Sequence, residues 1–144
     1  MTRAALLLLA LPALADPDLL ELVLDLARDG TYLPRAFRGD AGRAHALDLA
    51  VAFEAAGREY QEAPELLAAM ARQETTCRAG AVGRHGERGL LQTHPRWAPR
   101  GCRDGARLSR DVLYAVRCGA RELSRWRREC AQRLGRAASD AATL

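Results

Sequence analysis

This sequence of 144 residues contains no lysine, little aromatic material and no long hydrophobic run. All 22 basic residues are arginine, and aromatic residues make up 5% of the chain. So few rings leave little to stack on bases, and no nucleic-acid partner is expected. The longest apolar run covers residues 4–14, well short of the roughly 20 residues that cross a bilayer. An integral membrane segment is therefore not expected.

That short apolar run is typical of a secretory signal peptide. Arg3 precedes it, and Ala13-Leu14-Ala15 gives a small-x-small cleavage pattern before Asp16. We expect a signal peptide at residues 1–15, one domain at 16–136 and a disordered tail at 137–144. No cysteine closely follows the apolar run, so lipid attachment there is not expected.

Strand-like alternation of polar and apolar residues is also missing, which favours a mainly α domain. We expect four long helices, at residues 16–30, 40–57, 64–75 and 109–134. The second is apolar around most of its circumference and should be central. Glycine and proline punctuate residues 76–101, which predicts a loop with a small hairpin whose strand-like piece is Leu90-Leu91-Gln92.

The third expected helix starts at Pro64 and leads to one carboxylate. Leu67, Met70 and Ala71 form an apolar arc at about 100° per residue, and Glu74 falls in the same arc. Loss of water favours the protonated form of a carboxyl group, so this position predicts a general acid. In the alternative interpretation the helix ends by residue 73 and Glu74 is a solvated loop residue.

A glycine interrupts the apolar stripe of the last expected helix. The stripe contains Val112, Val116, Gly119, Leu123, Trp126 and Cys130. Glycine in a helix costs about 1 kcal/mol relative to alanine, so Gly119 marks a place where another segment approaches the backbone. We expect that segment to be the helix carrying Glu74.

Four cysteines, at positions 77, 102, 118 and 130, follow the predicted export signal, and disulfides are the default in that setting. Their spacing lacks the close pairs of structural zinc modules, so no metal is expected. On one helix Cys118 and Cys130 would be about 18 Å apart, too far to pair. Either Cys77 pairs with Cys118 and Cys102 with Cys130, or Cys77 pairs with Cys130 and Cys102 with Cys118. The second pairing is slightly favoured.

Charge divides the chain in two. Residues 16–71 hold 5 arginines against 11 acidic residues, whereas residues 72–136 hold 16 arginines against 6 acidic residues. The second half therefore favours an anionic partner, which for an exported protein points to a cell-wall polymer.

Three of these segments together resemble the bacterial lytic transglycosylase family of the SLT type, which is lysozyme-like. Glu74-Thr75 is similar to the family's helix-end Glu-Ser, and Gly89-Leu90-Leu91-Gln92 to its Gly-Leu-Met-Gln. The helix with Gly119 resembles the family's following helix. The resemblance covers about residues 60–130 and implies a lysozyme-like helical domain.

The same resemblance implies an enzyme that cleaves peptidoglycan between N-acetylmuramic acid and N-acetylglucosamine without a cofactor. Glu74 would protonate the glycosidic oxygen of the β-1,4 bond and then, as a base, take the proton of the muramyl 6-hydroxyl. The product would carry a 1,6-anhydro end. A monomer in the bacterial periplasm or outside the cell, with glycan strands as partner, is implied.

Further substrate contacts are implied at Thr75, Gly89, Leu91, Gln92 and Trp97. Gly89 would let a sugar approach the backbone, and Thr75 and Gln92 would hydrogen-bond the substrate or orient the acid. Trp97 would stack on a sugar ring or pack inside the domain.

Two alternatives remain open. Hydrolysis uses a second carboxylate about 5 to 9.5 Å from the first, and Glu87 is the nearby candidate. The chain also departs from the family pattern, because Ala115 stands where an asparagine is common and no Ala-Tyr-Asn motif follows. A non-catalytic peptidoglycan-binding protein is therefore the other alternative.

Overall fold

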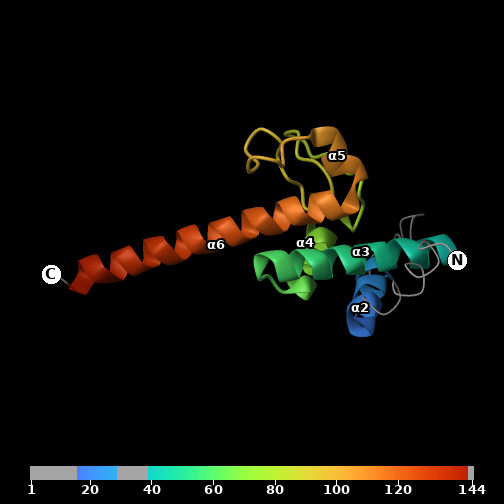
Figure 1. Cartoon of the computed structure of the whole chain (residues 1–144), viewed down its shortest axis with the longest axis horizontal. Coiled ribbons are helices and arrows are strands. Elements are labelled where there is room, and N and C mark those ends of the chain that lie inside the picture. Colours follow the sequence, from blue (N-terminus) through green and yellow to red (C-terminus); the bar gives the residue numbers. More distant parts are fainter. Residues whose placement is uncertain (1–15, 29–38, 143–144) are drawn as a thin grey trace, which may run out of the picture.

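The computed structural model describes residues 16–28 and 39–142, and helix α3 (Gly39–Tyr60) lies at the centre of that part. Helices α2 (Pro17–Arg28), α4 (Pro64–Thr75) and α6 (Val112–Ala142) all pack against α3, and the short helix α5 (Gly105–Arg110) packs against α6. Figure 1 shows α2 on one side of α3 and α6 on the other, with α5 and the adjoining loop beyond α6. The fold is mainly helical, as the sequence predicts.

Helix α3 is central because its buried face is broad and built largely from small side chains. That face consists of Gly42, Ala46, Leu49, Ala50, Ala52, Phe53, Ala56 and Gly57. Small residues let three helices approach one another closely, while Leu49 and Phe53 fill the space between them. The expected central position of this helix is confirmed.

The N-terminal predictions are only partly covered by the described residues. Helix α2 matches the first expected helix, and its buried Leu19, Val23 and Leu24 belong to the main core. The predicted signal peptide at 1–15 and most of the connection between the first two expected helices lie outside the described residues.

Helix α4 ends in a left-handed residue and two backbone hydrogen bonds. Thr76 follows the helix in the left-handed region, with φ 52°, and its N–H donates to the carbonyl of Arg72. The N–H of Cys77 reaches back to the carbonyl of Ala71, at 3.1 Å, as in a Schellman-type helix end. The helix thus includes Glu74 and stops directly after it.

The expected hairpin is reduced to isolated bridges. Val82 pairs with Arg88, and Arg88 with Thr93, without a continuous strand in the described part of the loop. The prediction of a strand-like segment at residues 90–92 is wrong, because these residues form a turn. Gly89 and Gln92 have φ values of 75° and 48°, and the N–H of Gln92 donates to the carbonyl of Gly89.

Asp111 divides the last expected helix into α5 and α6. Its N–H donates to the carbonyl of Arg107, and its carboxylate accepts the N–H of Tyr114 at 2.9 Å. The first bond ends α5 and the second caps α6. The hydrogen bond from the Tyr114 N–H, followed by the nearby Arg107 guanidinium, lowers the pKa of Asp111.

Helix α6 is longer than expected and extends beyond the helices that pack against it. It continues to Ala142, through residues 137–142 where a disordered tail was expected, because this alanine-rich end has high helix propensity. Figure 1 shows its C-terminal half extending past the other helices. The expected burial of Trp126 and Cys130 is therefore wrong, since both are exposed there.

Two ion pairs fix α6 to the end of α3 and the connection that follows. Arg117 contacts Glu59 at 2.7 Å, and Arg127 contacts Glu62 at 2.6 Å. The Glu62 side chain is only 3% exposed, so Arg127 balances a carboxylate that has lost nearly all of its water.

One disulfide joins Cys102 to Cys118, with a Cα–Cα distance of 5.6 Å. Cys77 is free and buried, and Cys130 is free and exposed. The pairing of Cys77 with Cys118 is therefore wrong. Of the favoured pairing, the Cys102–Cys118 bond is confirmed and the Cys77–Cys130 bond is not formed.

Candidate active site

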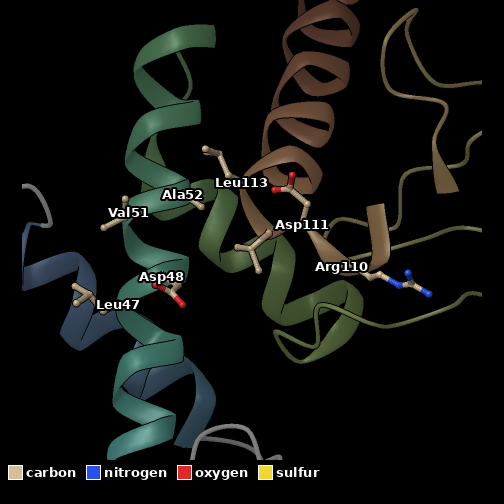
Figure 2. A pocket seen from close by; sticks show the side chains of 8 residues that line it. Leu47, Asp48, Val51, Ala52, Arg110, Asp111 and Leu113 are labelled. Carbon is tan, nitrogen blue, oxygen red and sulfur yellow. The ribbon is translucent and has the colours of Figure 1, made fainter. Parts of the chain in front are cut away.

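Two grooves are candidates for a ligand site. The larger, of about 620 Å³, lies between α3 and the corner where α5 meets α6. Figure 2 shows Leu47, Val51 and Ala52 on the α3 side, with Asp111 and Leu113 opposite and Arg110 pointing away. None of the residues predicted to bind or cleave a substrate lines this groove.

The smaller groove, of about 540 Å³, gathers the predicted residues instead. Its lining comes from α4, the loop that follows and α6: Met70, Leu91, Gln92, His94, Trp97, Gly119, Glu122, Leu123 and Trp126. Three of the nine, Leu91, Gln92 and Trp97, were predicted to contact a substrate, and Gly119 was predicted as a point of close approach. This groove is therefore the candidate active site.

Glu74 lies at the C-terminal end of α4, one helical turn beyond the groove residue Met70. Residues four apart share a helix face, so Glu74 lies on the same face of α4 as Met70, although Glu74 is not itself among the residues that line the groove. Glu74 is exposed, and the prediction of a buried carboxylate is wrong. The alternative is also wrong in placing Glu74 after the helix.

The buried residue at this helix end is Thr75, at 3% exposure. Its hydroxyl lies 3.0 Å from the carbonyl oxygens of both Ala71 and Leu90, so its proton is shared between α4 and the loop. Thr75 therefore fastens the end of α4 to the segment that carries Leu91 and Gln92. This placement favours orientation of the helix end over direct contact with a substrate.

Gly119 admits the side chain of Leu91 to the backbone of α6. A Cβ atom added at Gly119 would lie 2.3 Å from Leu91 Cδ1 and 2.6 Å from its Cβ. The expected close approach is confirmed, but the approaching segment is the loop and not α4. Leu91 itself is buried and forms part of the groove floor.

Gly89 serves a contact within the protein. Besides its positive φ, a Cβ atom there would lie 2.1 Å from the carbonyl oxygen of Leu108 in α5. The backbone of α5 thus fills the space that a side chain at residue 89 would need, which gives Gly89 a packing role; its predicted contact with a sugar stays a prediction.

Gln92 closes the turn that follows Gly89. Its side-chain Nε2 donates to the carbonyl of Gly89 at 2.9 Å, while the residue remains half-buried at the groove. One edge of the amide is held, and Gln92 stays a candidate for substrate contact.

Glu87 is used by the loop. Its carboxylate accepts the N–H of His85 at 3.0 Å and packs against Gly83, where an added Cβ would lie 2.2 Å from Oε2. Hydrogen bonds from backbone N–H groups, its own first, lower the pKa of Glu87. Glu87 is thus engaged by the backbone of the loop and does not line the groove.

Trp97 stands on a loop that is tied to α6 and is 63% exposed. The disulfide at Cys102 and the bond from Arg121 to the carbonyl of Arg100 both fasten that loop. The guanidinium of Arg96 lies 4.7 Å from the centre of the indole ring. Of its two predicted roles, the exposed position favours stacking on a ligand over internal packing.

Sequence reasoning missed Glu122 and assigned no role to His94. His94 is fixed by its neighbours, since Nε2 bonds the carbonyl of His85 and Nδ1 accepts the N–H of Arg96. Glu122 follows Gly119 by three residues on the same helix face. That i, i+3 relation to the interrupting glycine was the available signal.

No group of three metal-ligating side chains is found among residues 16–28 and 39–142. Within the same ranges no helix is long and apolar enough to cross a membrane.

The helical fold, with a helix-end glutamate beside a loop and a glycine-bearing helix, is of the lysozyme-like class. The transglycosylase SLT domain model matches residues 51–139, which is more than half of the chain. The chain therefore belongs to the SLT transglycosylase family. No curated protein and no solved structure shows a significant match.

Membership of this family assigns the chain in general to lytic transglycosylase-type action on peptidoglycan. Peptidoglycan lies outside the cytoplasm, and the Cys102–Cys118 disulfide fits an oxidising compartment.

Proposed function

We propose that this protein cleaves the β-1,4 bond between N-acetylmuramic acid and N-acetylglucosamine and leaves a 1,6-anhydro-muramyl end. One observation carries the proposal. The Thr75 hydroxyl fastens the helix end bearing Glu74 to the Leu90 carbonyl, at the start of the segment that forms the groove.

In this reaction Glu74 acts twice. Its protonated carboxyl group donates to the glycosidic oxygen as the bond to the muramyl C1 breaks. The resulting carboxylate then takes the proton of the muramyl 6-hydroxyl, whose oxygen closes on C1. The acid is regenerated, no water is consumed, and one carboxylate suffices.

Glu74 is exposed in the free protein, so a bound glycan would change its surroundings. A glycan lying in the groove would cover Glu74 and displace water from it, and loss of water favours the protonated form. The exposed indole of Trp97 offers a stacking face for such a glycan, and Gln92 offers a hydrogen-bonding amide beside it.

Hydrolysis with Glu87 as second carboxylate is less well supported, because its oxygens already accept hydrogen bonds from the backbone N–H groups of residues 85 and 87.

Digestion of purified peptidoglycan followed by mass spectrometry of the released fragments tests the proposal. We expect 1,6-anhydro ends from the wild-type protein and at least about 100-fold less release from Glu74→Gln, the lower range for loss of general acid–base catalysis. Glu65→Gln is the control, since Glu65 is an exposed glutamate in the first turn of the same helix.

Three other results would contradict the proposal. Reducing ends in place of anhydro ends would indicate a hydrolase. Binding of peptidoglycan without any released fragment would indicate a binding protein. Equal release from Glu74→Gln and Glu65→Gln would remove Glu74 from the reaction.

A further inference from the structure

The α6 wall of the candidate groove carries a carboxylate and an exposed indole one turn apart. Glu122 and Trp126 both line the groove, together with Trp97 from the loop. Because they are four residues apart, the two side chains share one face of the helix. This pair is separate from Glu74 and from the contacts that hold the groove together.

The Glu122 carboxylate is partly sheltered and loosely held. Its side chain is 26% exposed, and Oε1 lies 4.0 Å from Arg125 Nη2. Arg125 is itself shared with Glu129, at 3.7 Å. An ionised carboxylate has about four acceptor sites and no donor, so Glu122 can accept hydrogen bonds from a ligand in the groove.

The other polar groups nearby are more firmly engaged. The Gln92 amide donates to the Gly89 carbonyl, and both ring nitrogens of His94 have backbone partners. Glu122 is therefore the charged acceptor that the groove offers to the donors of a ligand.

Trp126 extends the groove along α6. Its side chain is 47% exposed, and the Arg125 guanidinium lies 5.4 Å from the ring centre. From Gly119 to Trp126 the helix rises by about 10 Å, at 1.5 Å per residue. This distance exceeds the length of one pyranose ring, so a sugar packed on Trp126 would be a different unit from one placed over Leu91 and Gly119.

We propose that Glu122 and Trp126 form a subsite for one N-acetylhexosamine unit away from the cleaved bond. The apolar face of the sugar ring packs on the Trp126 indole, and the Glu122 carboxylate accepts hydrogen bonds from the hydroxyl or amide N–H groups of the sugar. This inference rests on the proposed function, because it takes a peptidoglycan glycan as the ligand.

Titration of N-acetylglucosamine oligomers of increasing length into Glu74→Gln protein, followed by NMR, tests the subsite. The chain has two tryptophans, so its two indole N–H signals report separately on the two walls. We expect the Trp126 signal to shift only with oligomers long enough to reach it, and the affinity to rise at that length.

Adding Glu122→Gln should weaken binding of the long oligomers by about tenfold, the effect of one hydrogen bond to a charged group. Short oligomers should bind as before. The matched control is Glu129→Gln, which also removes a partner of Arg125 from α6 but lies outside the groove lining. Its affinity should be unchanged.

Equal affinities for Glu122→Gln and the parent, or equal losses for Glu122→Gln and Glu129→Gln, would overturn the subsite and leave the proposed function standing. Tighter binding of de-N-acetylated oligomers that is lost in Glu122→Gln would also overturn it, because Glu122 would then bind an ammonium group. If no oligomer binds and wild-type protein releases no peptidoglycan fragments, the proposed function itself fails.

Discussion

The contact between Gly119 and Leu91 predicts opposite effects for one substitution at two places in the same helix. In Gly119→Ala the new methyl group meets Leu91 Cβ at 2.6 Å, and that atom cannot move without its backbone. In Gly135→Ala, also in α6, the methyl group meets nothing within 4 Å. The pair separates the cost of the close approach from the helix preference of alanine.

The magnitudes follow from these two terms. Replacing glycine by alanine in a helix stabilises by up to about 1 kcal/mol. Forcing an extra methyl group into a packed site costs about 1–3 kcal/mol. Gly135→Ala should be neutral or up to about 1 kcal/mol more stable than the parent, and Gly119→Ala about 1–3 kcal/mol less stable than Gly135→Ala.

Urea unfolding of the disulfide-bonded protein measures this difference. With a slope near 2 kcal/mol per molar, typical of a small domain, the two midpoints should differ by about 0.5–1.5 M. Peptidoglycan cleavage should also fall in Gly119→Ala, because a displaced Leu91 shifts the adjoining Gln92 in the groove. A Gly119→Ala protein as stable and as active as Gly135→Ala would refute this account of Gly119.

Two further predictions concern the thiols and the helix caps. Iodoacetamide at pH 8 should label Cys130 in the native protein and Cys77 only after unfolding, because burial raises the pKa of the Cys77 thiol to about 11; mass spectrometry of tryptic peptides checks this, and failure to label Cys130 without prior reduction would contradict the free-thiol assignment. Asp111→Ala should lower the free energy of unfolding by about 1 kcal/mol at pH 7 through loss of the α6 cap. Since the fold lowers the pKa of Asp111, that contribution is full above the unfolded pKa of about 3.9 and is lost as the pH falls through the lower folded value; urea midpoints at pH 7 and pH 3 should show the gap closing, and a gap of constant size would contradict this.

The sequence predicted the helices well because each has a buried stripe with helical spacing and local end signals. It also identified Gly119 as a point of close approach, since glycine is costly inside a helix. It could not name the partner. Leu91 is 28 positions away in the sequence, and only the path of the loop brings it to α6.

Burial was harder to predict than secondary structure, because burial depends on what packs against a helix. In α4 the loop approaches through the Leu90 carbonyl and covers Thr75, which leaves the adjacent Glu74 in water. In α6 the apolar stripe continues, but the helix extends beyond its partners, so Trp126 is exposed. The helical spacing of apolar residues predicts neither the approach of the loop to α4 nor the extension of α6 beyond its neighbours.

The exposed position of Glu74 changes how the proposed reaction must be driven. Burial in the free protein would favour the protonated carboxyl group before substrate binds, whereas at an exposed position the ligand itself has to remove the water. Part of the energy from contacts distant from the cleaved bond is then used to create the acid, and that part raises the rate of the chemical step instead of the affinity. The aromatic side chains at Trp97 and Trp126 are the groove residues that can supply such contacts. In the proposed enzyme, the far ends of the groove are therefore part of what makes Glu74 an acid.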